Sequence, residues 1–415
     1  MAGGLMQLVA YGAQDVYLTG NPEVTFYQAK YKRHTNFAME NIEQTVNGTA
    51  ANSGRVSVTV ARNGDLVGDM YLELESDIAA TATAEAGDCN WVAERAISSV
   101  ELSIGGQRID KHYQKWWRLY SELYLDEAKK ATWGKMTTAA DGSTVYLPLV
   151  FFFNRNPGLY LPLIALQYHE VRIDIDLASD FDTFLNKSVF KVWANYVYLD
   201  TEERRRFAQK GHEYLIEQVQ HTGTDTVDPS ATKQVRLSYN HPVKELVWCF
   251  SNTAAKSSLW NFTAKNLVTE VALESDHTAV NDSNCYVPIS NLGTPMYATK
   301  LSSEAYTEEN AGQLETFKLV LNGQDRFKEQ KGKYFNQVQA YNHHSGCPAP
   351  GVYSYSFALK PEEHQPTGTC NFSRIDNAQV AVKMAAGTAT SMHMFATNYN
   401  VLRIQSGMGG LAFSN

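Results

Sequence analysis

Side chains able to bind a metal stand close together late in the chain, where the sequence holds His343, His344 and Cys347. Imidazole and thiolate groups are ligands for zinc and other soft ions. Two adjacent histidines seldom reach the same ion, however, and no fourth ligand follows at the spacing of such sites. A Pro-Ala-Pro run at 348–350 is typical of an exposed loop. We therefore predict an exposed loop here, with no metal and no other cofactor.

Two His-Glu dipeptides, His169-Glu170 and His212-Glu213, share their first two letters with the zinc-protease motif HExxH. That motif needs a second histidine one helical turn later, so that both rings face one ion, and neither dipeptide is followed by one. We expect each imidazole to be hydrogen bonded within a strand or a linker.

Paired carboxylates, the groups that cleave glycosidic bonds, occur as Glu362-Glu363 and as Asp174 with Asp176. Neighbours on one strand face are more often solvated charges, which is how we interpret both pairs. The sequence has no nucleophile elbow, phosphate loop or dinucleotide motif. The glycine-rich segment at 407–410 lacks the following helix, so we expect it to pack as a flexible terminus. These patterns predict that the protein is not an enzyme.

Five N-x-[ST] sequons offer asparagine side chains to a glycosyltransferase. The apolar N-terminus lacks the basic start and the cleavage site of a secretory signal, so we do not expect the secretory machinery to modify them. Two sequons lie in a long polar loop and are the glycosylation candidates. The five are Asn47, Asn186, Asn261, Asn281 and Asn371, and the two candidates are Asn261 and Asn281.

The charge balance does not favour nucleic-acid binding. The chain has 36 basic and 44 acidic residues, for a formal net charge of −8. No basic field therefore spans the molecule to attract a phosphate backbone. Short basic runs occur at 30–34 and 204–206, and we interpret them as solvated or interface charges. We predict no specific nucleic-acid partner.

Cysteine usage and hydropathy indicate where the chain is made. Its 5 cysteines are an odd number without a CxxC pair, which suits free thiols in a reducing compartment. No stretch approaches the roughly 18 to 20 apolar residues of a membrane span. We expect synthesis and assembly in the cytosol.

A strand and turn sequence occurs twice in the chain. LSIGGQR at 102–108 returns as LVLNGQDR at 319–326, with Gly106 and Gly323 in equivalent places. A looser pair joins 63–74 to 240–250. Because internal repeats indicate repeated structural units, the sequence predicts two like domains of about 200 residues each.

Period-two alternation of apolar and polar residues predicts antiparallel strands in both halves. The 23 Tyr, 18 Phe and 7 Trp also suit buried sheets. Helical periodicity is confined to 113–124 and to a short helix from Thr201, as N-cap, through about Gln209, ended by Gly211. Predicted strands include 56–60, 99–104, 147–153, 171–177, 190–199, 233–240, 243–251, 315–323, 352–359, 378–384 and 391–405.

These patterns predict an all-β fold, with two tandem eight-stranded antiparallel jelly-roll β-sandwiches (a double jelly roll) and a few short helices. The predicted parts are an N-terminal arm at 1–23, a first jelly roll at 24–203, a linker at 204–220, and a second jelly roll at 221–415 with a long loop at 253–314.

Several segments resemble the major capsid proteins of nucleo-cytoplasmic large DNA viruses, above all those of algal viruses such as the chloroviruses. The resemblance spans nearly the whole chain and is weakest in loops at about 77–95, 125–145 and 253–314. The matching segments are 3–22, 104–113, 161–171, 212–218, 321–327, 370–377, 399–404 and 406–411.

This resemblance implies a structural subunit of an icosahedral viral capsid. It implies a homotrimer that forms a pseudo-hexagonal capsomer and meets neighbouring capsomers and minor capsid proteins. The shell would cover an internal membrane, with that membrane or its proteins near the N-terminal arm, and covalent glycans could decorate the outer loops. The protein would reside in the virion and assemble in the host cytoplasm.

An alternative function is a glycan-binding jelly-roll protein, serving as an attachment or minor capsid component. Aromatic side chains in the long loop could stack on sugar rings. The candidates for that stacking are Trp260, Tyr286 and Tyr297.

Overall fold

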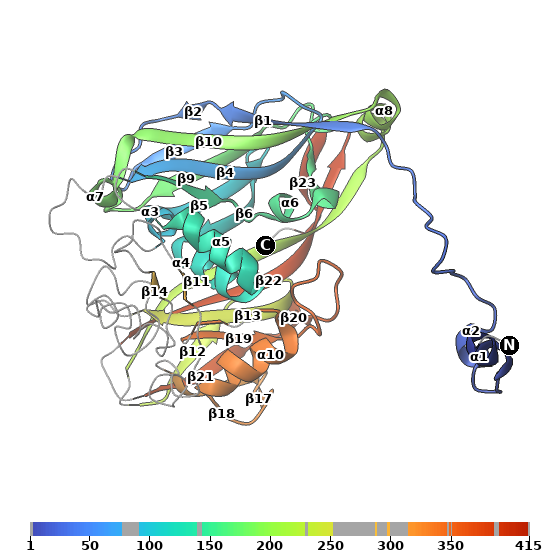
Figure 1. Ribbon diagram of the computed structural model, residues 1–415. Helices are drawn as coiled ribbons and strands as arrows, with labels where there is room; N and C mark the ends of the chain where they lie inside the picture. The colour runs from blue at the N-terminus through green and yellow to red at the C-terminus, as the bar shows by residue number, and fades with distance from the viewer. Residues whose placement is uncertain are drawn as a thin grey trace, which may run out of the picture. The chain divides into compact units, whose positions relative to one another are not determined.

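The computed structural model (Figure 1) divides into two units, Met1–Asn36 and Phe37–Asn415, and each is described by itself. The first unit holds the short helices α1 (Gly3–Val9) and α2 (Val16–Thr19), neither with a buried residue. The described residues are 3–76, 91–138, 143–228, 231–251, 287–288, 297–298, 314–346, 348–349, 351–385 and 390–413.

Two antiparallel sheets make the first jelly roll. Sheet 1 has the order β1-β10-β4-β7, with β8 beside β4, and sheet 2 has the order β2-β3-β9-β5-β6. The strands are β1 (Phe37–Gln44), β2 (Val46–Asn47), β3 (Arg55–Thr59), β4 (Leu66–Ser76), β5 (Ile97–Ile104), β6 (Gln107–Tyr113), β7 (Thr144–Pro148), β8 (Leu161–Pro162), β9 (Val171–Leu177) and β10 (Leu185–Leu199).

Two further antiparallel sheets repeat this arrangement in the second jelly roll. Sheet 3 has the order β11-β22-β13-β19, with β20 beside β13 and β23 beside β22. Sheet 4 has the order β12-β21-β16-β17, with β18 beside β16. The strands are β11 (His212–Val227), β12 (Lys233–Leu237), β13 (Pro242–Ser251), β16 (Leu314–Leu321), β17 (Gln324–Asp325), β18 (Gln330–Lys331), β19 (Val352–Ser356), β20 (Cys370–Asn371), β21 (Ala378–Met384), β22 (Thr390–Gln405) and β23 (Met408–Leu411). A separate pair joins β14 (Val287–Pro288) and β15 (Tyr297–Ala298).

Helices occupy the connections between strands. The pair α4 and α5 lies between β6 and β7, and the π-helix η7 with α10 lies at the equivalent point between β18 and β19. The helices are α3 (Val92–Ala96), α4 (Gln114–Tyr124), α5 (Glu127–Thr137), α6 (Phe152–Arg155), α7 (Phe181–Phe184), α8 (Thr201–Gln209), η7 (Tyr334–Val338) and α10 (Gln339–His343), with 3₁₀ turns η3 (Pro157–Leu159) and η8 (Phe372–Arg374).

The repeated glycine motif forms the same tight turn in both jelly rolls. Gly105 and Gly106 join β5 to β6 with φ of 58° and 83°, and Asn322 and Gly323 join β16 to β17 with φ of 50° and 80°. Positive φ at both central residues defines the type I′ hairpin turn, which matches strand twist and favours Asn-Gly and Gly-Gly. The predicted repeat is therefore real, and the all-β double jelly roll is confirmed.

Alternation correctly predicted the strands with one buried face. Val56 and Val58 of β3 and Ile173 and Ile175 of β9 have no exposed surface, while Arg172, next to Ile173, is exposed and Asp174 is half-buried. The helices predicted at 113–124 and 201–209 are present as α4 and α8.

Three local predictions were wrong. The apolar run 147–153 is not one strand, because β7 ends at Pro148 and α6 begins at Phe152. Helix α8 has Asp200 as its N-cap and Lys210 as its C-cap, rather than Thr201 and Gly211. The glycine-rich tail is a strand, β23, turned back onto β22.

The predicted division into domains stays a prediction. Strand β11 begins at His212, inside the predicted linker 204–220, and the whole of 37–415 forms one compact unit. The long loop 253–314 lies outside the described residues except for β14, β15 and its last residue, Leu314.

Candidate functional site

The two jelly rolls meet through an apolar face of sheet 3. Its residues alternate, so that Trp248 and Met394 enter the core of the second jelly roll while Val247 and Phe395 join the core of the first. The Phe395 ring lies 5.7 Å from that of Trp116 on α4. Both faces of β13, the strand at the centre of this contact, are buried, so its residues 243–251 leave no position that water could solvate.

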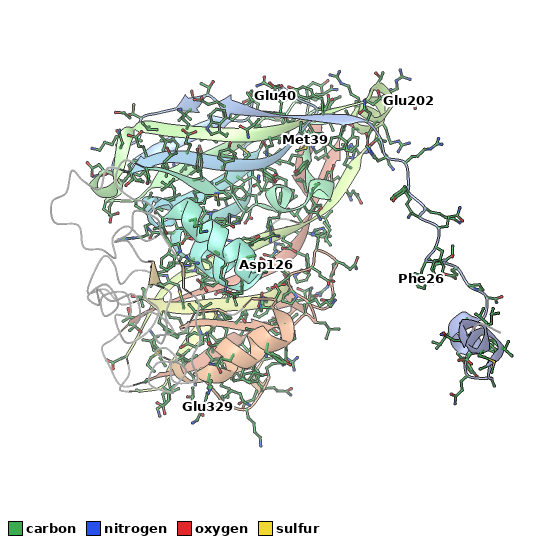
Figure 2. All side chains as sticks on the ribbon, viewed as in Figure 1. Phe26, Met39, Glu40, Asp126, Glu202 and Glu329 are labelled. Atoms are coloured by element: carbon green, nitrogen blue, oxygen red, sulfur yellow. The ribbon has the colours of Figure 1, made fainter. Side chains whose placement is uncertain are left out.

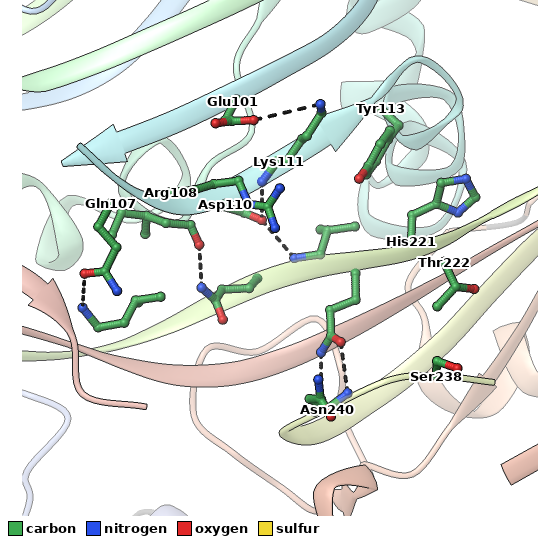
Figure 3. Close-up of a pocket in the computed structure, with 15 residues that line it drawn as sticks. Glu101, Gln107, Arg108, Asp110, Lys111, Tyr113, His221, Thr222, Ser238 and Asn240 are labelled. Carbon is green, nitrogen blue, oxygen red and sulfur yellow. Dashed lines mark hydrogen bonds and ion pairs between the residues drawn. The ribbon is translucent and has the colours of Figure 1, made fainter. Parts of the chain in front are cut away.

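Backbone and side-chain hydrogen bonds align β6 of the first jelly roll with β11 of the second. The Asp110 carboxylate accepts from the Val219 N–H at 3.0 Å, and the Gln218 amide donates to the Ile109 carbonyl. A polar groove of about 530 Å³ lies beside this seam, lined by both jelly rolls, and Figure 3 shows Asp110 and Lys111 on its β6 wall.

Buried charges cross the same interface at Glu217 of β11. Its carboxylate lies 2.9 Å from the Arg155 guanidinium of α6 and 2.7 Å from the Lys244 ammonium of β13. Burial alone would raise the pKa of Glu217, but these two cations hold that pKa below its usual range. Glu217 is therefore a buried anion that joins both jelly rolls.

A second buried cluster surrounds His344. Its Nε2 lies 2.5 Å from the Glu245 carboxylate, which also accepts from the Tyr124 hydroxyl of α4 at 2.6 Å. Nδ1 lies 3.4 Å from Glu362. Burial alone would lower the pKa of His344, but Glu245 and Glu362 raise the pKa to about 9, so the ring is charged at neutral pH.

Helices α3, α4 and α5 supply a third charged cluster. Arg118 lies 2.7 Å from Glu122 and 3.6 Å from Glu94, and the Trp133 indole donates to Glu94 at 2.6 Å. Glu122 in turn accepts from the Ala349 N–H of the second jelly roll at 3.0 Å. The three clusters thus hold the two modules in one fixed relation.

The structure corrects the prediction of an exposed loop around His343 and His344. The side chain of His344 is fully buried, and His343 Nδ1 lies 3.0 Å from the Leu359 carbonyl. Cys347 lies outside the described residues. The prediction failed because Glu245, the partner that makes burial of His344 favourable, is 99 positions away in the sequence.

The other predicted histidines are hydrogen bonded, as expected. His169 Nδ1 lies 2.9 Å from the Gly409 carbonyl, and His212 Nε2 lies 2.8 Å from the Phe207 carbonyl. Among the described residues, no group of three or more His, Cys, Asp or Glu side chains could hold a metal ion.

The carboxylate pairs are solvated only in part. Asp176 pairs with Arg55 at 2.6 Å, Asp174 pairs with Arg172 at 2.8 Å, and Glu363 pairs with Lys360. Glu362 is instead partly buried against His344 and accepts from the Ser345 N–H at 2.8 Å. The prediction of a solvated charge was therefore wrong for Glu362 and also for Asp174, whose side chain is only 13% exposed.

Three of the five sequons lie among the described residues. Asn47 and Asn371 are exposed, and Asn371 accepts from the Ser373 N–H, whereas Asn186 is half-buried and donates to Glu75. Asn261 and Asn281, the glycosylation candidates, lie outside the described residues.

Sequence reasoning missed Arg155, Glu217 and Lys244. A usable signal was present in β13, where Lys244 and Glu245 interrupt an otherwise apolar run. Charged residues are almost never fully buried unless they are paired, so such an interruption indicates a buried partner. Which residue is that partner could not be predicted from the sequence.

The fold and the interface between the two jelly rolls define the class of protein. The fold is a double jelly roll whose modules are joined by a buried interface, and the charged side chains of that interface are paired with one another. Within the described residues, no helix is long and apolar enough to cross a membrane. These facts define the class as a double-jelly-roll protein whose two modules form one compact unit.

Comparison with known proteins agrees. The family described as large eukaryotic DNA virus major capsid protein matches residues 203–410, and the family described as major capsid protein N-terminus matches residues 25–200. The major capsid protein of Paramecium bursaria Chlorella virus 1 is 44% identical over 100% of both chains. That of Phaeocystis pouchetii virus is 40% identical, also over 100% of both. The quasi-atomic capsid structure of the chlorella virus has a TM-score of 0.77 at 40% identity, covering 94% of this chain and 100% of that one.

The chain belongs to the major capsid protein family of large eukaryotic DNA viruses. It is a structural subunit of an icosahedral viral capsid and not an enzyme. The glycan-binding alternative is not favoured. Two of its aromatic candidates, Trp260 and Tyr286, lie outside the described residues, and the side chain of Tyr297 in β15 is not described either.

Proposed function

We propose that the protein forms a homotrimer that serves as a pseudo-hexagonal capsomer. The observation that carries this proposal is the repetition of one strand order in two modules held rigidly together. Three such chains present six similar modules, so a threefold ring can occupy a sixfold position and meet neighbouring capsomers and minor capsid proteins.

The proposal is tested by the mass of the purified protein in solution. Light scattering should give three times the 46.4 kDa of one chain, and electron microscopy should show discs with a hexagonal outline. A stable monomer at micromolar concentration would contradict the proposal.

The N-terminal arm is proposed to face the inside of the shell, near an internal membrane or its proteins. The arm belongs to the unit Met1–Asn36, which is separate from Phe37–Asn415, and it exposes large apolar side chains. Leu8 is 77% exposed, Tyr17 93% and Leu18 87%. Apolar surface of this extent marks a binding segment, and the basic run 30–34 suits anionic headgroups.

Vesicle flotation tests this role of the arm. Full-length protein should float with anionic phospholipid vesicles, and Leu8→Asp with Leu18→Asp should reduce the floated fraction severalfold. Leu359→Asp, a control at an exposed leucine outside the arm, should float like wild type. If all three proteins float equally, or if none of them floats, the arm does not bind lipid.

Assembly in the host cytoplasm and glycans on the outer loops complete the proposal. Cys249 and Cys370 are free thiols, which suits a reducing compartment. Mass spectrometry of protein from virions tests the glycans directly, since Asn261 and Asn281 should carry added mass. Unmodified peptides at both positions would exclude them as glycosylation sites.

A further inference from the structure

Two histidines lie on the face of sheet 3 that the first jelly roll covers. His221 of β11 pairs across the sheet with Phe395 of β22. His393 lies two residues before Phe395 and pairs with Cys249 of β13. Phe395 and Cys249 belong to the core of the first jelly roll, and alternate residues of a strand share a face. The contact between the two modules is thus apolar at its centre and ends in two imidazoles.

Helix α4 of the first jelly roll packs on this face, and we call the contact between α4 and sheet 3 the joint. The Trp116 ring of α4 lies 5.7 Å from that of Phe395, and the preceding residue, Lys115, is only 9% exposed. In Figure 2, Asp126, two residues beyond the end of α4, lies between the sheets of the two jelly rolls. Separation of the two modules at the joint therefore requires α4 to leave sheet 3.

The two imidazoles pack against aromatic rings and against each other. The His221 ring stacks on Phe395 at 4.5 Å and meets the Tyr113 ring of β6 edge to face at 4.9 Å. The His393 ring lies 6.0 Å from that of His221, with 23° between the two planes. Because two imidazolium ions at this separation repel each other, the packing favours neutral rings.

The hydrogen bonds of the two rings also suit the neutral form. His221 Nδ1 lies 2.9 Å from the Met394 carbonyl, which can only accept, so Nδ1 carries the single proton of this ring. His393 Nε2 lies 3.0 Å from the Ser251 hydroxyl and its Nδ1 lies 3.4 Å from the Thr224 hydroxyl. A hydroxyl can donate or accept, so these two partners satisfy the one donor and one acceptor of a neutral imidazole.

The surroundings disfavour a second proton on either ring. Burial is the main cause that lowers the pKa of both imidazoles, and the Lys115 ammonium of α4 lowers both further. The pKa of His393 falls to about 3, and the neighbouring His221 contributes to that shift. The Asp225 carboxylate of β11 acts in the opposite direction on His221.

Two further titratable groups face the joint, Tyr113 from β6 and Cys249 from β13. Burial raises the pKa of both, so neither carries a charge in the pH range where the imidazoles titrate. Figure 3 shows Tyr113 and His221 at one end of the polar groove, and both rings line it. Protons from solvent can therefore reach His221 without unfolding of the chain.

The first jelly roll has an ion pair where the second has His393. Trp193 of β10 corresponds to Phe395 of β22, since each pairs with the first long strand of its jelly roll on one side and with β4 or β13 on the other. Two residues before Trp193 stands Lys191, whose ammonium lies 3.5 Å from the Glu73 carboxylate. The titratable imidazoles thus occur on the face that is covered by the other module.

We propose that His221, His393 and Lys115 make the joint between the two jelly rolls sensitive to acid. At neutral pH both rings are uncharged and α4 packs on sheet 3. Proton uptake by both rings places three positive charges in one partly buried space, and their repulsion loosens α4 from the sheet. A shell built from such chains is stable at neutral pH and weakens on acidification. The device lies within one chain, so it goes beyond the proposed trimer and does not depend on it.

Acid removes the stability that the neutral rings contribute. The pKa of His393 is about 3 in the folded protein and 6.5 ordinarily, so its contribution is complete above pH 6.5 and is lost as pH falls toward 3. At pH 5 this ring alone raises the unfolding equilibrium constant about thirtyfold over its neutral value. Carboxylates such as Glu217 also lose stability in acid, so the difference between wild type and histidine variants is the quantity to measure.

Urea unfolding of the full chain at about pH 7.5 and about pH 5 tests the joint. The double variant His221→Gln with His393→Gln cannot take up the protons, so the ratio of its unfolding constants at the two pH values should be at least tenfold smaller than that of wild type. Lys115→Met should also reduce the ratio, because it removes the neighbouring charge. The control His343→Gln, in α10 outside the joint, should keep the wild-type ratio. Because the measure is a ratio, a variant that is less stable at both pH values still gives an answer.

Hydrogen exchange shows whether the effect is located at the joint. In wild type, the amides of α4 should lose protection at pH 5 after correction for the intrinsic exchange rate, and in the double variant they should keep it. A double variant with the wild-type ratio of unfolding constants would overturn the proposal. So would equal protection of the α4 amides at both pH values in wild type, or a His343→Gln ratio that falls as far as that of the double variant.

Discussion

The two jelly rolls share a strand order and a turn type but differ in what their equivalent positions contact. Trp193 and Phe395 occupy matched places in sheets 1 and 3, yet Phe395 is 1% exposed and Trp193 is half-buried. The strand order is fixed by alternation and by hairpin turns that both modules keep. The outward faces differ in burial, because the first jelly roll covers that of sheet 3.

Truncating the matched aromatic residues gives the largest expected contrast. Phe395→Ala should lower the free energy of unfolding by about 3 to 5 kcal/mol, because it leaves a cavity between the modules. Trp193→Ala should cost the isolated monomer about 1 to 2 kcal/mol, since it removes less buried area. Urea unfolding of dilute protein measures both. Equal losses would mean that the two faces are equally buried in the monomer.

Removing the buried anion should have an effect nearly as large. Glu217→Gln leaves Arg155 and Lys244 without their carboxylate, and breaking a buried pair in this way costs about 3 to 5 kcal/mol. The control is Glu213→Gln on the same strand, whose pair with Arg403 is exposed and should contribute under about 1 kcal/mol. Similar melting temperatures for the two variants would contradict the role of Glu217 at the interface.

The repeated hairpin turn offers a comparison between a glycine at its first central position, Gly105, and one at its second, Gly323. A Cβ added to Gly105 would overlap the His169 imidazole, whereas one added to Gly323 meets nothing within 4 Å. Both residues have positive φ, which costs a non-glycine residue about 1 to 2 kcal/mol. Gly105→Ala should therefore destabilise the protein clearly more than Gly323→Ala in thermal unfolding. The reverse order would show that His169 moves aside freely.

A further expected effect is the pH dependence that His344 contributes to stability. Its pKa of about 9 in the folded protein lies above the ordinary 6.5, so its stabilising contribution is complete below pH 6.5 and is lost as pH rises through 9. Unfolding free energy should fall by about 1 to 3 kcal/mol between pH 7 and 10. His344→Gln should flatten this slope while lowering stability at pH 7. An unchanged slope in the variant would mean that another titratable group causes the pH dependence of stability.

The sequence predicted most of the strands and both matched hairpins, because alternation and Gly-Gly or Asn-Gly turns are local signals. It did not predict α5, which falls in a region expected to be a loop. The hydrophobic periodicity of this helix is weak, because residues such as Lys130 are buried beside Glu122 rather than solvated.

The interface was the part least accessible to sequence reasoning. Its pairs join residues far apart in the sequence, 62 positions for Arg155 with Glu217, 121 for Tyr124 with Glu245 and 227 for Glu122 with Ala349. No local pattern specifies such partners. The isolated charges in β13 indicate only that a partner exists.

Strand order also sets the timing of folding during translation. Strand β1 pairs with β10, so Phe37 finds its partner only once Leu199 has been synthesised. At a translation rate of roughly 5 to 20 residues per second, β1 stays unpaired for on the order of ten seconds or more after its own synthesis. The second module imposes a similar delay, because His212 of β11 pairs with Ile404 of β22. A protein needed in many copies thus exposes unpaired, aggregation-prone strands for a long interval during synthesis. Its yield in a cell should therefore depend on the supply of chaperones.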